Sequence, residues 1–274
     1  MKLTRTVGFV LVASLLGETV LAQHGDTLAM SVHGHRMRLV VSRGNGPTVV
    51  LEAGAGSTHR TWDRLRQQLD PAIRVVAYDR PGFGDSEICM ATRDALTIAR
   101  ELRAALAAAR LAPPYLLVGW SAGGIYMRVF ASEFPAEVVG LVLLDPTPEN
   151  FYRKAESAFP EVFRRLDAID SANIRSGPRA ELAEEAAWED ALAQARQSDA
   201  KLSAPIVLLS ALRPDLEVLA DIWHAEQRTW TARQQNAVFR VVAQSGHAIH
   251  RDRPDTVARV IHDAIAGLPK ARMP

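Results

Sequence analysis

The sequence predicts an α/β fold in which a mostly parallel central sheet is flanked by helices and carries a helical insertion. Short runs of β-branched residues alternate with helical patterns along residues 23–274, as expected when helices connect parallel strands. Residues 138–144 are almost continuously apolar, which is typical of a strand buried on both faces. Residues 147–201 are rich in Ala, Glu and Arg and show no strand pattern. We therefore expect one domain over residues 23–274, with a helical cap at about 147–201.

The elements are predicted in chain order from hydrophobic periodicity and from turn residues. Two strands, at 28–32 and 37–42, flank a Gly-containing turn and form a hairpin. Further strands are expected at 48–51, 73–78, 115–118, 138–144, 202–210 and 239–243. Helices are expected around Trp62, Leu65 and Leu69 and at 97–111, 125–134 and 255–265.

Composition and charge limit the classes of function. The 274 residues are 48% hydrophobic and 23% charged, which suits one large globular domain. The formal net charge is +1 and no run of five basic residues occurs, so we expect no nucleic-acid partner.

The first 22 residues are predicted to be a signal peptide. Lys2 and Arg5 precede an uncharged apolar stretch at 7–16, and Ala22 fits a small-residue cleavage site. The stretch is shorter than the roughly 20 apolar residues that span a bilayer, and no cysteine follows the cleavage site for lipid attachment. We expect cleavage near Ala22, export to the periplasm or the medium, and no stable membrane anchor.

The motif Gly119-Trp120-Ser121-Ala122-Gly123 lies between a predicted strand and a predicted helix. In this context Gly-x-Ser-x-Gly forms a sharp turn that exposes the serine hydroxyl above the sheet. Bulky side chains at either glycine would clash within the turn. We therefore expect Ser121 to be a nucleophile.

Four landmarks in the same order resemble the α/β-hydrolase family over essentially all of residues 23–274. The stretch 49–54 resembles the strand that leads to the oxyanion loop, and 78–86 resembles the turn after the next strand. The segment 119–124 matches the nucleophile elbow, and 246–254 resembles the segment with the catalytic histidine. The resemblance implies an α/β-hydrolase fold with a cap. Because the elbow holds serine and not aspartate, it implies the serine esterase and lipase branch.

A serine hydroxyl needs a base to accept its proton near neutral pH. His247 follows the last predicted strand, where its loop would lie over the elbow. His250 is the nearest competitor, and His59 lies near the oxyanion loop, where it would contact substrate. The other histidines are interpreted as surface or structural residues: His24, His33, His35, His224 and His262.

The histidine in turn needs an acid that fixes its tautomer. The resemblance places this acid after the strand that follows the cap, where Asp215 is the first choice. Asp145, at the end of the apolar strand, is the alternative, because some members of the family carry the acid one strand earlier. Asp221 is a distant third. Position along the fold, and not chemistry, separates these candidates.

The oxyanion hole is expected to consist of the backbone N–H groups of Ala55 and Ala122. Many members of the family have His-Gly before the first donor, whereas this chain has Ala53-Gly54 preceded by Glu52. A backbone donor does not depend on that histidine, so we expect the hole to be preserved.

No cofactor or metal site is expected. The glycines at 54–56 and 82–84 lack the third glycine of a dinucleotide fingerprint, and neither segment contains a P-loop lysine. No His-Glu-x-x-His or similar spacing indicates zinc. Cys89, the only cysteine, has no His or second Cys beside it and is interpreted as a small buried apolar residue.

These residues together predict an exported, cofactor-free serine hydrolase acting on a small-molecule ester with a small or medium acyl group. An aminopeptidase of the proline iminopeptidase type, or a cofactor-free perhydrolase, would use the same triad. A non-catalytic ligand-binding protein of the same fold is the alternative from another class. The aromatic residues of the insertion are interpreted as helix packing: Phe151, Tyr152, Phe159, Phe163 and Trp188.

Overall fold

The computed structural model of the chain describes residues 25–268. The predicted signal peptide, residues 1–22, lies outside the described residues. Within the described part of the chain, no helix is both long enough and apolar enough to span a bilayer.

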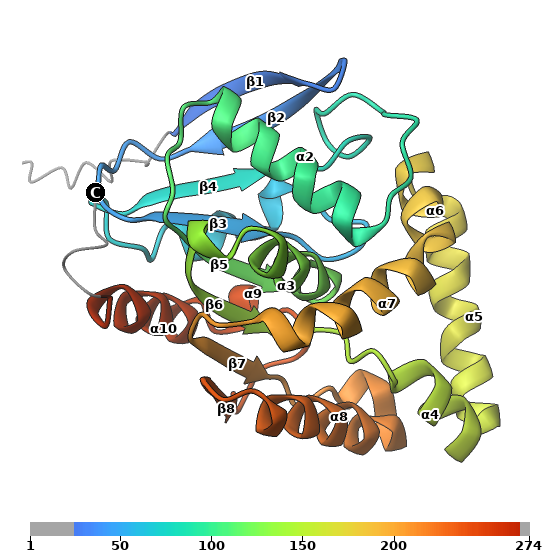
Figure 1. Ribbon diagram of the computed structural model, residues 1–274. Coiled ribbons are helices and arrows are strands. Elements are labelled where there is room, and N and C mark those ends of the chain that lie inside the picture. The colour runs from blue at the N-terminus through green and yellow to red at the C-terminus, as the bar shows by residue number, and fades with distance from the viewer. Residues whose placement is uncertain (1–24, 269–274) are drawn as a thin grey trace, which may run out of the picture.

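Within residues 25–268, eight strands form one sheet in the order β1-β2-β4-β3-β5-β6-β7-β8 (Figure 1). The strands are β1 Asp26–Val32, β2 His35–Val41, β3 Thr48–Glu52, β4 Arg74–Tyr78, β5 Tyr115–Trp120, β6 Val138–Leu144, β7 Ile206–Ser210 and β8 Ala237–Val241. β2 pairs antiparallel with β1 and with β4, and all the other pairs are parallel. The predicted mostly parallel sheet is therefore confirmed.

Helices cover both faces of this sheet (Figure 1). One face carries α2 Ala95–Ala108, α3 Ala122–Glu133, α7 Trp188–Ser198 and α8 Ala220–Arg233, and the other carries α1 Asp63–Arg66, α9 Ile249–Asp252 and α10 Pro254–Ala266. Short 3-10 segments lie at His59–Trp62, Pro135–Glu137, Asp199–Lys201 and Pro214–Leu219. The helix expected around Trp62 is thus only a 3-10 turn followed by α1.

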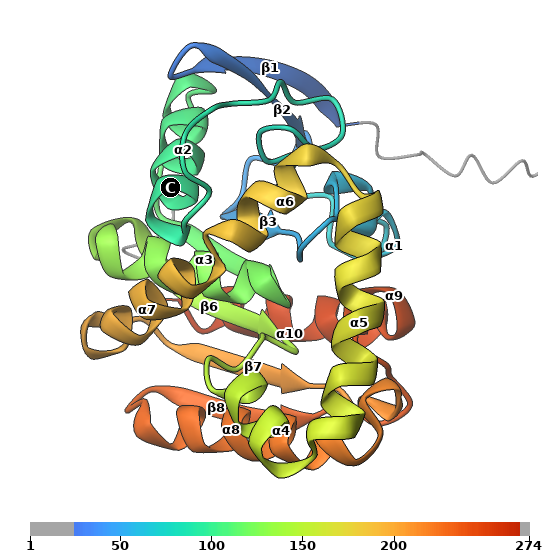
Figure 2. The same cartoon turned by 90° about the vertical axis from the view of Figure 1, so that its right-hand side faces the viewer.

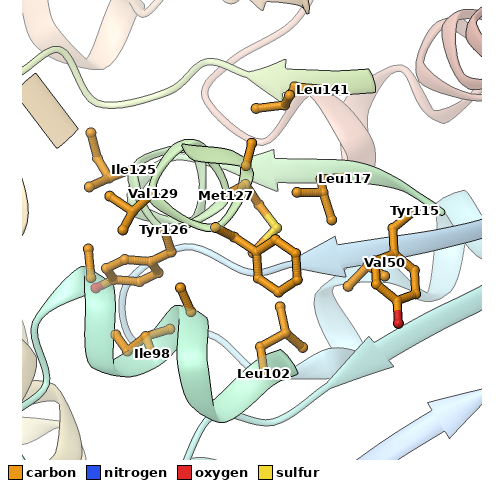
Figure 3. Close-up of a cluster of buried hydrophobic side chains, with 14 of the residues drawn as sticks. Val50, Ile98, Leu102, Tyr115, Leu117, Ile125, Tyr126, Met127, Val129 and Leu141 are labelled. Atoms are coloured by element: carbon orange, nitrogen blue, oxygen red, sulfur yellow. The ribbon is translucent and has the colours of Figure 1, made fainter. Parts of the chain in front are cut away.

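The core between the sheet and α2 and α3 follows from two periodicities. Ile98 and Leu102 are four residues apart, so they share one face of α2 and pack toward Val50 and Leu117 of the sheet, with Met127 from α3 (Figure 3). All five side chains are at most 1% exposed. Truncating such a side chain, for example Leu102→Ala, is expected to cost about 2–5 kcal/mol of folding free energy.

Four helices connect β6 to β7 (Figures 1 and 2). They are α4 Phe151–Ala158, α5 Pro160–Ser176, α6 Arg179–Ala186 and α7. The first three, called the cap below, lie at the edge toward which the parallel strands point, and α7 returns against α3. The cap is thus placed over the residues that follow the strand ends.

The helix α8 has no counterpart among the predicted elements. Its buried face contains Trp223 and Trp230 but also the polar residues Glu226, Gln227 and Thr231. Because polar residues occupy much of the inward face, the segment shows no apolar stripe of helical period.

The parallel strands bring separate chain segments together at one edge of the sheet. Glu52, at the end of β3, pairs with Gly119 of β5, and Trp120 pairs with Leu144 at the end of β6. The residues that directly follow these three strand ends must therefore lie side by side.

Candidate active site

Ser121 occupies the turn between β5 and α3. Its backbone has φ 56° and ψ −124°, a conformation that non-glycine residues rarely adopt. A Cβ at Gly119 would lie 2.5 Å from the carbonyl oxygen of Gly123, and a Cβ at Gly123 would lie 2.5 Å from that of Glu52. Only glycine fits at both positions, which is the physical reason for the Gly-x-Ser-x-Gly spacing.

His247 lies between β8 and α9 and meets the serine. Its Nε2 is 2.9 Å from Oγ of Ser121. Trp120 donates from its indole N–H to the backbone carbonyl of His247 over 2.8 Å, and the two rings lie 5.2 Å apart. The residue before the serine therefore also helps to position the histidine.

Asp145 directly follows β6 and is fully buried. Its Oδ2 lies 2.7 Å from Nδ1 of His247. Its Oδ1 accepts hydrogen bonds from the indole of Trp223 (2.8 Å), the amide of Gln227 (3.0 Å) and the backbone N–H of Ala211 (3.2 Å). The carboxylate is thus fixed at both oxygens.

These contacts also determine the charge of Asp145. Burial raises its pKa, but the hydrogen bond and charge of His247, together with the charge of Arg213, outweigh burial and hold the pKa below its ordinary value. An ionised carboxylate can only accept hydrogen bonds. Nδ1 of His247 therefore carries the proton, and the lone pair on Nε2 faces the hydroxyl of Ser121.

The structure reverses the order of the two candidate acids. Asp215, the first choice, does not contact His247: its carboxylate forms a two-point ion pair with Arg213 over 3.0 and 2.8 Å. The reason lies in the chain direction after β7, because Arg213 has φ 50° and Pro214 begins a 3-10 turn. Arg213 therefore points toward the triad, and the Asp215 side chain remains 54% exposed. Asp221, the third candidate, is exposed at the start of α8.

Arg213 is a charged neighbour of the triad that the sequence did not predict. Its Nη1 lies 3.2 Å from Nδ1 of His247, and its guanidinium lies 4.4 Å from the centre of the Trp223 ring. Two donors cannot hydrogen-bond to each other, so Arg213 acts on the imidazole as a nearby cation. Asp215 compensates that cation.

Ala122 directly follows Ser121, and Ala55 lies on the loop after β3. Within residues 25–268, the backbone N–H of neither residue donates to another protein group. Ala122 is the first residue of α3, where free N–H groups and the helix dipole favour negative charge. A Cβ at Gly54 would lie 3.0 Å from Cβ of Ser121, so the loop that carries Ala55 packs directly against the serine.

Arg80 anchors the loop that carries Ala55. Its guanidinium is 1% exposed and donates to the carbonyls of Ala53 (2.8 Å) and Gly54 (3.0 Å). It also pairs with Glu52 over 2.8 Å and with Glu184 of the cap over 2.7 Å. All five N–H groups of Arg80 are used. The side chain of Arg80 thus connects the cap to the loop, and Glu52 and Glu184 are its two counter-ions.

The two competing histidines are bonded elsewhere. Nε2 of His250 lies 2.7 Å from Oγ1 of Thr61, and burial lowers its pKa to about 3, so His250 is neutral at neutral pH. His59 is 6% exposed, and its Nδ1 lies 2.9 Å from the carboxylate of Asp79. The expectation that His59 contacts substrate is therefore replaced by a structural role.

The cap places carboxylates near the triad. Oε1 of Glu181 covers the oxyanion loop so closely that a Cβ at Gly56 would lie 2.4 Å from it. Asp170 is near enough to Arg213 and His247 for their charges to affect its pKa. Burial, assisted by neighbouring carboxylates, raises the pKa of Asp170, Glu181 and Glu185. The carboxyl groups of Glu181 and Asp170 therefore lie close to the Ala55 loop and to Arg213, respectively.

The aromatic residues of the insertion mostly pack between helices. Phe151 lies 4.9 Å from the Trp223 ring, and Tyr152 and Phe163 join the same cluster. Because Trp223 donates to Asp145, Phe151 of α4 helps to hold a hydrogen-bond partner of Asp145 in place. Phe159 is 41% exposed, and Trp188 packs at the main core.

Sequence reasoning missed Arg213, Trp223, Gln227 and Glu184. Arg213, Trp223 and Gln227 contact Asp145 or His247, and no motif in their local sequence indicates that they lie at the site. Glu184 is buried, with Ala180, on a helix whose other residues are partly or fully exposed, and its burial is a consequence of the tertiary structure. Arg80 lies within the 78–86 segment, which resembles a family turn, but no signal in that segment indicated that its side chain is buried.

Comparisons with known proteins agree with this architecture. The sequence profile of the alpha/beta hydrolase family matches residues 49–260. The uncharacterized protein YqjL of Bacillus subtilis is 38% identical over 102 residues, which are 37% of this chain and 40% of that protein. Pimeloyl-[acyl-carrier protein] methyl ester esterase of Nitrosomonas europaea is 33% identical over 117 residues, 43% of this chain and 44% of that protein. Both alignments span less than half of the relative's length.

The fold is similar to that of solved structures. A thermophilic esterase from Thermogutta terrifontis superposes with a TM-score of 0.63 and 20% identity, over 88% of this chain and 98% of that one. At this identity the likeness concerns the fold alone. The family profile, by contrast, covers more than half of the sequence, and the chain therefore belongs to the alpha/beta hydrolase family.

Proposed function

We propose that the chain is a serine hydrolase that cleaves a carboxylic ester of small or medium acyl length through an acyl-enzyme intermediate. The observation that carries this proposal is the continuous contact from Ser121 Oγ to His247 Nε2 (2.9 Å) and from His247 Nδ1 to Asp145 (2.7 Å). A nucleophile, a base and an acid in hydrogen-bonded series are the parts that acyl transfer needs.

In the proposed reaction, His247 accepts the proton of Ser121 while Oγ attacks the ester carbonyl. The charge that develops on the carbonyl oxygen is held by the N–H groups of Ala55 and Ala122. His247 then donates its proton to the departing alcohol, and Asp145 stabilises the imidazolium in between. Water, activated by His247, releases the acid and restores Ser121.

A fluorophosphonate probe tests the nucleophile. It should label the folded chain at Ser121 and leave Ser121→Ala unlabelled. Ser176→Ala, which removes an exposed hydroxyl at the end of α5, should be labelled like the wild type. If the folded wild-type chain resists the probe, the proposal is wrong, and the non-catalytic binding protein becomes the better interpretation.

p-Nitrophenyl esters of graded acyl length test the substrate class. An initial burst of p-nitrophenol equal to the enzyme concentration would support an acyl-enzyme. The highest kcat/KM is expected for short to medium acyl chains.

An aminopeptidase is the second candidate, favoured by the carboxylates of Glu181 and Asp170 beside the site. A substrate ammonium group would be attracted by them. Hydrolysis of a prolyl amide with a kcat/KM above that of every neutral ester would favour this candidate. A perhydrolase would use the same residues, and peroxide-dependent formation of a peracid tests for it.

A further inference from the structure

Three potential metal ligands meet away from the serine. His35 begins β2, Cys89 lies in the loop between β4 and α2, and Glu101 lies on α2. Nε2 of His35 is 3.8 Å from Oε1 of Glu101, and Sγ of Cys89 is 3.5 Å from the same oxygen. The three ligand atoms all lie within 4.8 Å of one another.

The histidine supplies a second, independent observation. His35 is only 8% exposed, and its Nε2 has no hydrogen-bond partner among the described residues. A buried ring nitrogen without a partner is costly to maintain. Here the nitrogen belongs to a ring that faces a carboxylate and a thiol, and a cation between them would complete its bonding.

The spacing suits a first-row transition metal. A point about 2.4 Å from all three atoms exists for a triangle of these dimensions, close to the ~2.0–2.3 Å of zinc bonds to N, O and S. Imidazole, thiolate and carboxylate together are ligands that Zn²⁺ accepts. A cavity of about 520 Å³, lined by these residues and by His33 and Met90, leaves a fourth position open to solvent.

Arg93 places a positive charge beside Cys89 and Glu101. Its Nη1 donates to the second carboxylate oxygen of Glu101 over 2.7 Å and contacts Sγ of Cys89 over 3.1 Å. Arg93 thus holds the carboxylate of Glu101 through one oxygen, while the other oxygen, Oε1, accepts the hydrogen bond of the Cys89 thiol. A metal would take over the contact to sulfur as the thiol gives up its proton to solvent.

We propose that His35, Cys89 and Glu101 form a binding site for a divalent transition metal of the zinc type, with one coordination position open. The site is separate from the Ser121 triad and joins β2, the 79–94 loop and α2. The spacing of residues in the sequence could not indicate this site, because the three ligands come from distant segments. Cys89 is also not the buried apolar residue that was expected, since it is partly exposed at the cavity.

Co²⁺ titration of the untagged, chelator-treated chain tests the site. One equivalent should produce a thiolate-to-cobalt charge-transfer band, and Zn²⁺ should abolish the band. His35→Gln and Cys89→Ser should lose the band. His33→Ala should retain it, because His33 lines the same cavity and is not one of the ligands.

Alkylation provides a second readout, whose first arm needs only the wild-type chain. Cys89 is the only cysteine, so iodoacetamide reports on this site alone. Zn²⁺ should slow alkylation of the wild type and of His33→Ala at least about tenfold, and that of His35→Gln much less. Absence of both the cobalt band and zinc protection in the wild type would overturn the proposal. Equal protection of His35→Gln would overturn it as well.

Discussion

Oδ2 of Asp145 lies 2.7 Å from Nδ1 of His247, in a position that is fully buried. Asp215, by contrast, reaches the histidine only through Arg213. The two aspartates therefore affect the same imidazole in different ways. In the proposed reaction, Asp145 holds the tautomer and stabilises the imidazolium, while Asp215 compensates the neighbouring cation Arg213.

We expect Asp145→Asn to lower kcat by about 10³–10⁴-fold, because the amide cannot stabilise the imidazolium and favours the wrong tautomer. Asp215→Asn should lower kcat by about tenfold or less. It should also move the acid limb of the kcat/KM profile to lower pH, since the uncompensated Arg213 disfavours a second positive charge. Steady-state kinetics from pH 5 to 9 check both. An equal loss in the two variants would contradict the assignment of Asp145.

Arg80 should influence catalysis through the oxyanion loop. Losing one oxyanion donor typically costs about 10²–10³-fold in kcat. Lysine cannot serve both carbonyls and both carboxylates, so Arg80→Lys should lower kcat at least about tenfold with little change in KM. Glu184→Gln keeps one of the two oxygens that accept from Arg80 and leaves Arg80 itself in place, so its effect should be milder.

Arg128→Lys is the matched control for this prediction. Arg128 is also buried, pairs with Glu149 and Asp199 and lies 4.3 Å from the centre of the Trp230 ring. Its replacement should lower the midpoint of thermal unfolding and leave kcat unchanged. Equal effects of both substitutions on kcat would show that Arg80 acts only through general stability.

The fold could be predicted because its determinants are local. Apolar runs such as 138–144 and the glycines around Ser121 describe buried strands and a sharp turn within a few residues of sequence. The helix α8 could not be predicted, because Gln227 and Thr231 occupy its inward face as partners of Asp145 and of the backbone. In a sequence, a polar residue whose hydrogen bonds are made inside the core cannot be distinguished from a surface residue.

Part of the candidate site follows from the same local signals. Ser121 directly follows β5, and His247 and Ala55 lie in the loops after β8 and β3, so motif and chain order placed these residues at one edge of the sheet. The choice between Asp145 and Asp215 depended on where each side chain points after its strand, and both Asp145 (φ 42°) and Arg213 (φ 50°) have a positive φ there. His35, Cys89 and Glu101 meet only through tertiary packing, so no spacing in the sequence marks them.

The carboxylates of the cap should select substrates by charge. At equal acyl length, kcat/KM should decrease from a cationic ester to a neutral ester to an anionic ester, because Glu181 and Asp170 lie beside the site. Glu181→Gln with Asp170→Asn should reduce the difference severalfold, and added salt should reduce it in the wild type. Glu161→Gln, in the first turn of α5, is the control. No charge preference in the wild type would contradict this prediction.

Asp94 should make the stability of α2 depend on pH. Its side chain accepts from the backbone N–H groups of Leu96 and Thr97 at the start of the helix. Although burial opposes it, hydrogen bonds from Thr97 and Gln194 lower the pKa of Asp94 from 3.8 to about 2. A lowered pKa means that the ionised group stabilises the fold above pH 4 and that this contribution is lost as pH falls toward 2.

Replacement of Asp94 by alanine should therefore lower the free energy of unfolding by about 1 kcal/mol at pH 7, as is typical for loss of an N-cap. The difference from the wild type should shrink between pH 4 and pH 2, because protonation weakens the cap in the wild type as well. Urea unfolding at a series of pH values measures it. Asp263→Asn, which removes an exposed carboxylate on α10, should show no such trend. A difference that stays constant down to pH 2 would mean that the Asp94 cap does not depend on its charge.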